Sequence, residues 1–320
     1  MNKIISNKNS KNFNLLVGNI FFSENNLNQE LNNINPFFSS IEQKLKEEIK
    51  KIKDQRCLGL LNISIVKNKK TTSYIEKHRE QGNIKARLIK SYNINDELII
   101  INTAGGLTSG DINFCSINIG SNVVLNITTQ SMEKVYKCKN FSAKLYTNIV
   151  IGANSYISWM PLETIFFNGG KLRKRINIDL EKNSNFLGVE TMIFGRQAMG
   201  EVINNGELDD AWQVNKGGKL IYSDFNRISG NINKKINNSF ILMGNKVFCN
   251  IIYTGKKIKL YAKNITKYLN KSKYFAGVSI VNGVLLLKVL AKDIIEIRSF
   301  LDDLIIIFDH NFNLPKIWSC

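Results

Sequence analysis

The glycine-rich segment AGGLTSGD (104–111) is the first place in this sequence where residue types and spacing could do chemistry. A phosphate-binding loop follows GxxxxGK(S/T), in which the lysine reaches the terminal phosphates and the hydroxyl reaches magnesium. Here Gly110 is followed by Asp111, whose negative charge would repel a phosphate group. The GxGxxG pattern and the GxSxG elbow of hydrolases are also absent. We therefore predict a tight turn between two strands.

Catalysis through a nucleophile or a metal ion lacks its usual residues. The chain has only two histidines: His78, in a polar stretch that we expect to be an exposed loop, and His310, near the end. A Ser-His-Asp or Cys-His arrangement would depend on one of them. No HExxH pattern occurs, and the carboxylates of the central region stand singly on different expected strands: Asp111, Glu133, Glu163, Glu190 and Glu201. We predict no catalytic residue and no enzymatic activity.

Two charged motifs have local structural explanations. GRQAMGE (195–201) is predicted to be a β-turn in which Arg196 pairs with Glu201. TQSMEKVYK (129–137) is predicted to be an edge strand with solvated charges.

The charge balance is strongly basic, with 44 Lys and Arg against 26 Asp and Glu and a formal net charge of +18. Such an excess would favour nucleic acid, anionic lipid or an acidic protein as a partner. The lysines are scattered along a chain rich in Lys, Asn and Ile, however, as expected when AT-rich codons drift into tolerant positions. Only KVYKCKNF (134–141) interleaves basic and aromatic residues as single-stranded nucleic acid requires. We expect no nucleic-acid partner and keep a basic β-rich nucleic-acid-binding protein as the alternative function.

Composition also bounds the cellular context. The chain has 320 residues, and its 18 Phe, 10 Tyr and 3 Trp supply burial that a disordered chain lacks. Five cysteines, without a CxxC pair, predict neither a disulfide framework nor a structural zinc. The N-terminus has no signal-peptide pattern, and the most apolar stretch, 278–290, is interrupted and too short to span a bilayer. We expect a soluble cytoplasmic protein without a membrane partner.

From residue 58 onward the chain has the rhythm of strands and turns. Short β-branched-rich runs alternate with Gly, Asn, Asp and Ser over about 170 residues. The runs are LGLLNISIV, ELIIINT, VVLNITT, YISWMP, INIDL, FLGVETMIF and KLIYSDF. These runs predict a mostly β fold.

A repeat lies within this β region. INIGSNVVLNITT (117–129), IVIGANSYISWMP (149–161) and INIDLEKNSNFLGVE (176–190) each predict a strand, a tight turn and a second strand. The turns are assigned to Asn122, Asn154 and Asn185, spaced by 32 and 31 residues, because Asn tolerates positive φ. Each unit would expose an apolar face unless it stacked on the next, so we predict layered β-coils. Chance resemblance between hairpins is the alternative.

Helices are expected mainly near the ends. Residues 41–53 and 291–308 have apolar residues at helical spacing, and 262–271 is a candidate short helix. We predict a variable N-terminal extension over 1–40 and a single β-rich domain over 41–320.

Four segments together resemble one family: NTAGGLTSGD (102–111), TTQSMEKVYK (128–137), WMPLETIFFNGG (159–170) and FGRQAMGE (194–201). In order and spacing they resemble the urease accessory protein UreD, called UreH in some organisms. The ending LPKIWSC (314–320) is similar to the PxIW ending of many members. The motif positions to which we assign structural roles are Gly105, Gly106, Gly110, Thr128, Thr129, Lys134, Tyr136, Trp159, Pro161, Glu163, Thr164, Gly195, Arg196, Gly200 and Glu201.

The chain also departs from the family pattern. Members commonly open the glycine turn with His-Pro-Pro, where this chain has Asn102, Thr103 and Ala104. A role of that histidine is therefore not transferred to this chain. Glu133 stands where Thr is usual, and Lys137 where Arg is usual.

The resemblance implies a non-catalytic scaffold of mostly β structure, with stacked strands and a few helices. Family members bind apo-urease and recruit UreF and, through it, the GTPase UreG, so that nickel reaches the urease active site. UreD is also thought to form part of a protected path for nickel. We expect no tightly bound cofactor, because a transported ion must be held weakly enough to leave.

Two sets of residues are candidates for these roles. Scattered carboxylates suit a hydrated divalent ion, so we hypothesise that Asp111, Glu163 and Glu190 line a transient nickel path, with structural salt bridges as the alternative. The C-terminal tail and the stripe of 291–308 are candidate partner surfaces, unless the stripe covers the β body. The stripe residues are Ile294, Ile297, Leu301, Leu304 and Phe308.

Overall fold

The computed structural model describes residues 56–68, 72–91, 95–196 and 199–319, together with the backbone of 15–17 and 20–22. The strands are β1 (Leu15–Val17), β2 (Ile20–Phe22), β3 (Leu58–Lys67), β4 (Ser73–Gln81), β5 (Ile84–Ile89), β6 (Asp96–Asn102), β7 (Ile112–Ile119), β8 (Val124–Thr129), β9 (Glu133–Val135), β10 (Ala143–Ile151), β11 (Tyr156–Trp159), β12 (Thr164–Phe166), β13 (Lys171–Leu180), β14 (Asn185–Phe194), β15 (Gly206–Lys216), β16 (Lys219–Gly230), β17 (Val247–Thr254), β18 (Phe275–Val281) and β19 (Val284–Ala291). The helices are α3 (Ile232–Ile236), α4 (Ile258–Leu269), α5 (Ile294–Ile305) and the 3-10 turn η2 (Lys316–Ser319).

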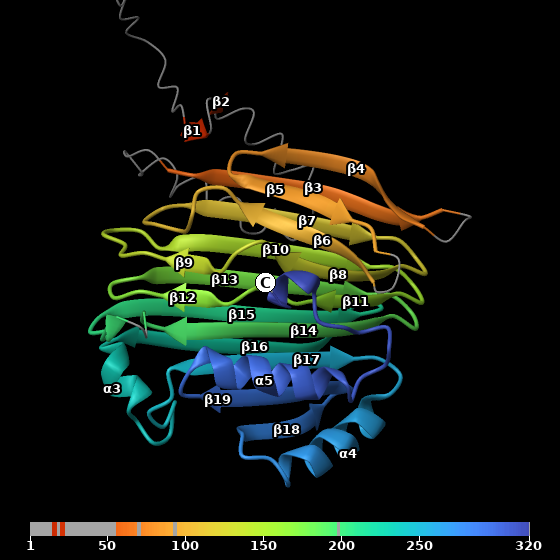
Figure 1. Cartoon of the computed structure of the whole chain (residues 1–320). Helices are drawn as coiled ribbons and strands as arrows, with labels where there is room; N and C mark the ends of the chain where they lie inside the picture. The colour runs from red at the N-terminus through yellow and green to blue at the C-terminus, as the bar shows by residue number, and fades with distance from the viewer. Residues whose placement is uncertain are drawn as a thin grey trace, which may run out of the picture.

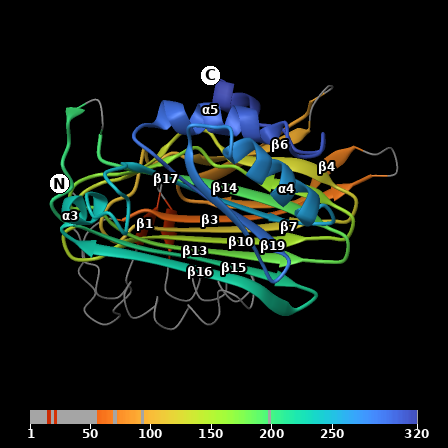
Figure 2. The ribbon, with the colours of Figure 1, turned by 90° about the horizontal axis from the view of Figure 1, so that it is seen from below.

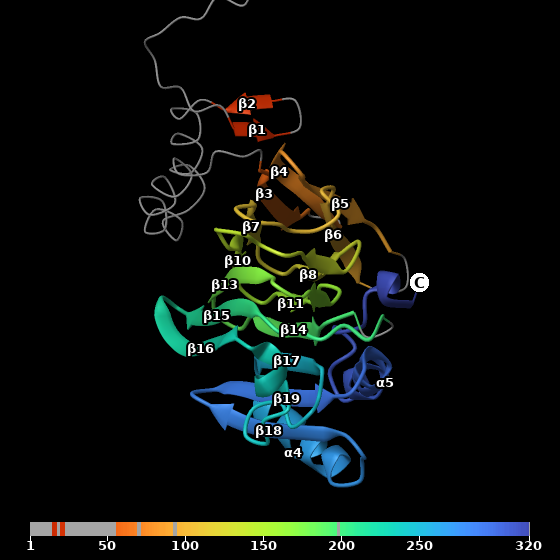
Figure 3. The same cartoon turned by 90° about the vertical axis from the view of Figure 1, so that its left-hand side faces the viewer.

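Two sheets face each other along the molecule. One has seven strands in the order β16-β15-β13-β10-β7-β3-β4, and the other contains β18-β19-β17-β14-β11-β8-β6-β5, extended by β12 and β9. Consecutive strands alternate between the sheets: β7, β10 and β13 lie in the first, and β8, β11 and β14 lie in the second. Because like strands pair in parallel, each strand pair forms one coil of a β-solenoid. Figures 1 and 3 show the coils stacked from β4 to β18.

The predicted layered coils and the mostly β fold are confirmed. The turns between the strands of each coil also stack, since the amide of Asn122 donates to the carbonyl of Ala153 at 2.9 Å and that of Asn154 to Lys182 at 3.1 Å. Asn122 and Asn154 have positive φ, as predicted. The third assignment was wrong: Asn183 has positive φ, while Asn185 is the buried first residue of β14. The second and third turn residues, Asn154 and Asn183, are therefore 29 positions apart, against 32 for Asn122 and Asn154.

Stacking in register lines the interior with rows of like residues. In the seven-stranded sheet, Ile63, Ile117, Ile149, Ile178 and Val214 follow one another across five strands. All five are fully buried in the core between the sheets. Successive side chains of a strand point to opposite faces, so this row fixes which residues of each strand face inward.

Helices cover the outer face of the ten-stranded sheet. Figure 2 shows α4 and α5 on this side, opposite β13, β15 and β16. Asp293 caps α5 by accepting from the amide of Glu296 at 3.0 Å, and Glu296 accepts in return from the amide of Lys292 at 3.1 Å. The helix therefore begins three residues after the predicted stretch, because β19 continues to Ala291. The candidate helix over 262–271 is confirmed as α4 with an earlier start.

The remaining fold predictions are either wrong or not tested by the structure. The segment with His78, predicted to be a loop, is the edge strand β4, which pairs with β3. The candidate helix over 41–53 lies outside the described residues, and of the predicted extension only the backbone of β1 and β2 is described. That 41–320 form a single domain stays a prediction. Among the described residues, no helix combines the length and the apolar character needed to cross a membrane.

The isoleucine row generates the first prediction. Replacing Ile149, at the centre of the row, with Ala should lower the free energy of unfolding by about 2–5 kcal/mol, because the cavity cannot close between stacked coils. Val150 is the next residue of β10, is partly exposed and points outward. Denaturant titration of Ile149→Ala beside Val150→Ala tests this. Equal losses would contradict the inward assignment.

Candidate functional site

A largely polar row, which we call the polar row, lies four residues back along the strands from the isoleucine row. Asn113, Leu145, Lys174 and Asp210 follow one another in register across β7, β10, β13 and β15. They share the inward face with the isoleucine row, because they lie four residues before it on each strand. From the opposite sheet, Glu190 of β14 faces them. Buried polar and charged groups are therefore concentrated in one layer of an otherwise apolar interior.

A cavity of about 80 Å³ lies at this layer. Its apolar wall includes Ile84, Ile100 and Leu162. Its polar lining includes Asn102, Asn113, Cys115, Glu133, Lys174 and Glu190. The ten strands from β5 to β14 thus all contribute to the lining of one cavity.

The central contact is an ion pair between the two sheets. Lys174 Nζ lies 2.5 Å from Glu190 Oε2, with side-chain exposures of 10% and 8%. Trp159 Nε1 donates to the other oxygen, Glu190 Oε1, at 2.9 Å. Burial disfavours the ammonium form, but the carboxylates of Glu190 and Asp210 outweigh it and raise the pKa of Lys174. Lys174 therefore carries its charge inside the protein.

Glu133 faces the same cavity. Asn102 Nδ2 lies 3.2 Å and 3.0 Å from its two oxygens. Burial raises the pKa of Glu133 to about 7, although the hydrogen bond from Asn102 acts in the opposite direction. Asn102 is also the residue that replaces the family histidine. The prediction of solvated charges in this segment was wrong for Glu133, although Lys134 and Lys137 are exposed.

A second, larger cavity of about 440 Å³ continues beyond the polar layer. Asp210 lines it together with Met192, which is two residues from Glu190 on the same face of β14, and with Lys288. Lys288 Nζ pairs with Asp224 Oδ2 at 2.9 Å. Burial raises the pKa of Asp210, against the effect of Lys174. Lys174 thus lines the smaller cavity, and its register partner Asp210 lines the larger one.

The three carboxylates predicted to line a path occupy different environments. Glu190 lines the cavity. Glu163 is buried, but Arg298 of α5 pairs with it at 2.9 Å and 3.2 Å on the outer face of the sheet. Asp111 accepts from the amides of Cys57 at 2.9 Å and Thr108 at 2.7 Å, and burial raises its pKa. The structure thus brings none of these three together. Glu163 and Glu190 each form the structural salt bridge of the alternative, with Arg298 and Lys174, and Asp111 accepts backbone hydrogen bonds.

The glycine turn is a close backbone approach rather than a ligand loop. Gly105, Gly106 and Gly110 all have positive φ. A Cβ on Gly106 would lie 2.6 Å from Tyr136 Cε2 and 2.8 Å from the carbonyl oxygen of Lys134. The next residue, Leu107, exchanges backbone hydrogen bonds with the segment of β9. The turn therefore joins two of the motifs.

The other motif residues also have structural partners. Arg196 Nε pairs with Glu201 Oε2 at 3.0 Å, as predicted, and its guanidinium lies 4.9 Å from the ring centre of Phe167. Thr129 Oγ1 accepts from the amide of Leu162 at 3.0 Å. Gly195 approaches the carbonyl of Glu201 closely. Thr128 is buried on the opposite face of β8, and Thr164 begins β12 beside the cavity.

The predicted partner stripe faces the protein's own core. Ile297, Leu301, Leu304 and Phe308 are buried against the ten-stranded sheet, and Ile294 packs at the edge of the same cluster. The alternative, that the stripe covers the β body, fits this burial. The tail is docked as well, since Trp318 Nε1 donates to the carbonyl of Met160 at 3.1 Å and the amide of Lys316 donates to Glu97 at 2.8 Å.

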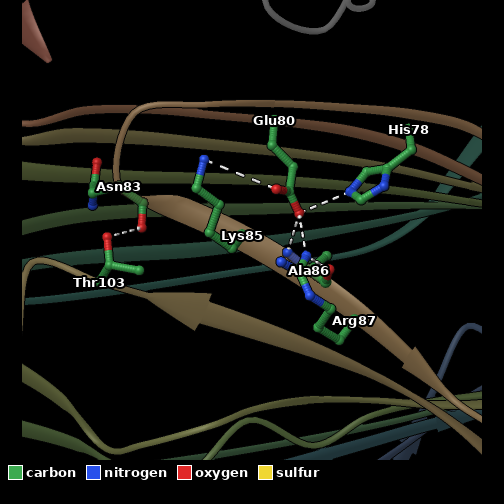
Figure 4. A network of polar contacts seen from close by, with 7 residues as sticks. All are labelled: His78, Glu80, Asn83, Lys85, Ala86, Arg87 and Thr103. Carbon is green, nitrogen blue, oxygen red and sulfur yellow. Dashed lines mark hydrogen bonds and ion pairs between the residues drawn. The ribbon is translucent and has the colours of Figure 1, made fainter. Parts of the chain in front are cut away.

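His78 belongs to a charged network at the end of the stack. Figure 4 shows Glu80 between His78, Lys85 and Arg87, and Glu80 Oε1 lies 2.8 Å from His78 Nε2 and 2.5 Å from the amide nitrogen of Ala86. Burial acts to raise the pKa of Glu80, but the Ala86 amide and His78 lower it below its ordinary value. Within the described ranges, no group of three or more His, Cys, Asp and Glu residues is arranged to hold a metal ion.

Sequence reasoning missed Lys174 and Asp210 and misjudged Glu133. One signal for the first two was present: Lys174 alternates with Ile176 and Ile178, and Asp210 with Trp212 and Val214. Alternation places a charged residue inside as soon as the strand is assigned. The convergence of Glu133 and Glu190 from distant strands had no such signal.

Comparison with known proteins places the chain in a family. The family model described as "UreD urease accessory protein" matches residues 59–319. The chain belongs to the UreD family. A urease accessory protein UreD of Rhizobium leguminosarum bv. viciae is 32% identical over 240 residues, or 75% of this chain and 87% of that protein. One of Agrobacterium fabrum is 30% identical over 268 residues, or 84% and 93%. The UreD match thus includes the solenoid, the helices α3 to α5 and the tail.

The glycine turn generates a prediction. Gly106→Ala should destabilise the protein by at least about 2 kcal/mol more than Gly105→Ala, because only the former drives a Cβ into Tyr136 and the Lys134 carbonyl. An added Cβ at Gly105 would meet no atom within 4 Å, so Gly105→Ala costs only the strain of a positive φ. Yield of folded protein and thermal unfolding of the two variants test this. A fully stable Gly106→Ala variant would refute the close approach.

Glu133 predicts a pH dependence of stability. Its pKa is about 7 in the folded protein against an ordinary value of 4.5, so the folded state holds a proton that the unfolded state releases between these values. The free energy of unfolding should therefore fall as pH rises through this window, by up to about 3 kcal/mol. Glu133→Gln should lack this fall. Denaturant unfolding from pH 5 to pH 8, in chelator-treated buffer, measures both.

Glu80→Gln is the control for this experiment, because the pKa of Glu80 is lowered. The carboxylate of Glu80 contributes to the free energy of unfolding above its unfolded pKa, and this contribution is lost as pH falls. The pH dependence due to Glu80 is therefore opposite in sign to that due to Glu133. If Glu133→Gln and wild type kept a constant difference across the range, the raised pKa of Glu133 would be wrong.

Proposed function

We propose that this chain is a urease maturation scaffold that acts in the cytoplasm, binds apo-urease, and recruits UreF and, through it, the GTPase UreG. The observation that carries the proposal is the UreD family match over residues 59–319. The relatives are named urease accessory proteins, at about a third identity over most of both chains. The proposal assigns no catalytic residue to the chain.

We propose further that nickel, as cargo, passes through the interior of the solenoid. Two cavities and the carboxylates of Glu133, Glu190 and Asp210 support this route. Carboxylate and amide oxygens suit a hydrated divalent ion, and bind it less tightly than a His and Cys cage would. Relative to the sequence hypothesis, Glu190 is retained, while Glu133 and Asp210 take the places of Asp111 and Glu163.

The partner surface follows from what is exposed. The apolar stripe of α5 is buried, so a partner must bind other residues. Exposed apolar side chains cluster instead around the segment after α3, where Phe240 is 95% exposed and Met243 49%. This segment borders the larger cavity through Ile241 and Leu242. It is the candidate contact surface of the proposal.

Reconstitution tests the proposed function. The tagged full chain is co-expressed with the urease subunits, UreF and UreG of the same organism, and urease activity is measured with nickel. We expect co-purification with urease and UreF, and at least a tenfold loss of activity when the chain is omitted. The single omissions of UreF and UreG are the controls.

Full activation without the chain, and no association with urease or UreF, would overturn the scaffold. Binding of the chain to nucleic acid with an affinity that falls steeply with salt would then support the alternative function.

A further inference from the structure

One group of neighbouring side chains borders both cavities. Lys174 and Glu190 line the smaller cavity, and Asp210 lines the larger one. Lys174 and Asp210 are register partners on the neighbouring strands β13 and β15, which places their side chains about 5 Å apart on the same face. An ion that moved from one cavity to the other along this layer would therefore meet this group.

The Lys174–Glu190 pair closes this point. Its nitrogen–oxygen distance is 2.5 Å, and both Glu190 oxygens are occupied, one by Lys174 and one by Trp159. Lys174 belongs to one sheet and Glu190 to the other, so the pair spans the interior. The ammonium group of Lys174 also interacts electrostatically with the carboxylates of Asp210 and Glu133, which are partly buried.

Unpaired polar atoms around the pair point to a ligand. Asn113 and Asn250 are 2% and 4% exposed, and neither the oxygen nor the nitrogen of either side-chain amide has a hydrogen-bond partner in the described chain. Asn113 lines the smaller cavity, and Asn250 is the register partner of Glu190. Asp210 Oδ1 is likewise buried without a partner. Buried polar groups are normally satisfied, so each of these calls for an explanation.

Carboxylate and amide oxygens gathered in this way are ligands for a hard divalent cation. The site already holds a cation, the ammonium of Lys174, on the same carboxylate that such an ion would use. A lysine has four rotatable side-chain bonds and exchanges partners more easily than a planar guanidinium fork. Exchange of one cation for another keeps the buried carboxylates neutralised throughout.

We propose that Lys174 is the gate of the interior passage: its ammonium group occupies Glu190 beside Asp210, and a hydrated divalent cation passes from one cavity to the other only by displacing it. The gate rests on the proposed nickel route. Return of Lys174 to Glu190 then expels the ion, so the lysine both admits the cargo and prevents its retention. No covalent bond is made or broken in this exchange.

Two substitutions of Lys174 should act in opposite directions. Lys174→Gln removes the competing ammonium, so Ni²⁺ should bind at least tenfold more tightly. Lys174→Arg keeps the charge and forms a two-pronged pair with Glu190, so binding of Ni²⁺ should weaken at least threefold. The measurement is calorimetric titration of the purified full chain, or of its complex with UreF, with Ni²⁺.

Activation of urease gives a second readout. At limiting nickel, both variants should lower activation several-fold, the Gln variant because it retains the ion and the Arg variant because it excludes it. Excess nickel should restore activation by the Gln variant.

Lys144→Gln is the matched control. Lys144 is a second buried lysine, on the adjacent strand β10, but its register partner is Arg173 and its side chain points to the opposite face from Lys174. Nickel affinity should not change in this variant. The double variant Lys174→Gln, Glu190→Gln should lose the gain of the single Gln variant, because the carboxylate that takes the ion is gone.

The gate is overturned if folded Lys174→Gln and Lys174→Arg bind Ni²⁺ within twofold of wild type, since a purely structural ion pair predicts that result. Should Lys174→Gln fail to fold, Lys174→Arg decides alone, because unchanged affinity and activation in that variant exclude a gate. Nickel affinity is measured without urease. Suppose that Ni²⁺ binds more tightly to Lys174→Gln and more weakly to Lys174→Arg, as predicted, but urease is activated without this chain. That result would refute the proposed function and leave the gate standing.

Discussion

The fold depends on one constraint, the in-register stacking of parallel strands from coil to coil. Once β7, β10 and β13 pair in parallel without a shift, residues at equivalent positions form continuous rows across the sheet. Each row is either entirely inside or entirely outside. The composition of a row, rather than of a strand, therefore decides what the interior contains at each level.

The isoleucine row and the polar row, four residues apart along each strand, place opposite kinds of side chain in the interior. The row through Ile117, Ile149 and Ile178 is filled with aliphatic side chains, whose burial is the main source of stability. The row through Asn113, Lys174 and Asp210 contains groups that are costly to remove from water. A chain selected only for stability would repeat isoleucine in both rows. Well-packed apolar residues in place of a buried ion pair often give equal or greater stability. The charged residues of the polar row are therefore not explained by stability alone.

The coils could be predicted from the sequence because strand and turn signals are local. The contents of the polar row could not, because they depend on which distant strands meet. Strand and turn signals are local, so the repeat and the positive-φ residues Asn122 and Asn154 were within reach. Asn185 was misassigned because a nearly constant spacing was expected, whereas the stretch between the second and third turns is three residues shorter than that between the first two and places Asn183 in the turn. Glu190 was named for its strand, but Glu163 sits on a neighbouring segment and turns outward to Arg298. Which side a carboxylate faces is decided by strand alternation, and which carboxylates meet is decided by the closure of two sheets.

Helix α5 and the C-terminal tail cover the outer face of the ten-stranded sheet. Glu163 anchors α5 through Arg298, and the tail holds the sheet through Trp318 and Lys316, so one outer face is closed by the chain itself. The larger cavity is bordered by Ile241 and Leu242, the neighbours of the exposed Phe240. A partner that covered this segment would also cover the mouth of the cavity. Cargo passing between partner and interior would then leave bulk water at the contact itself, because Asp210 already lines the same cavity.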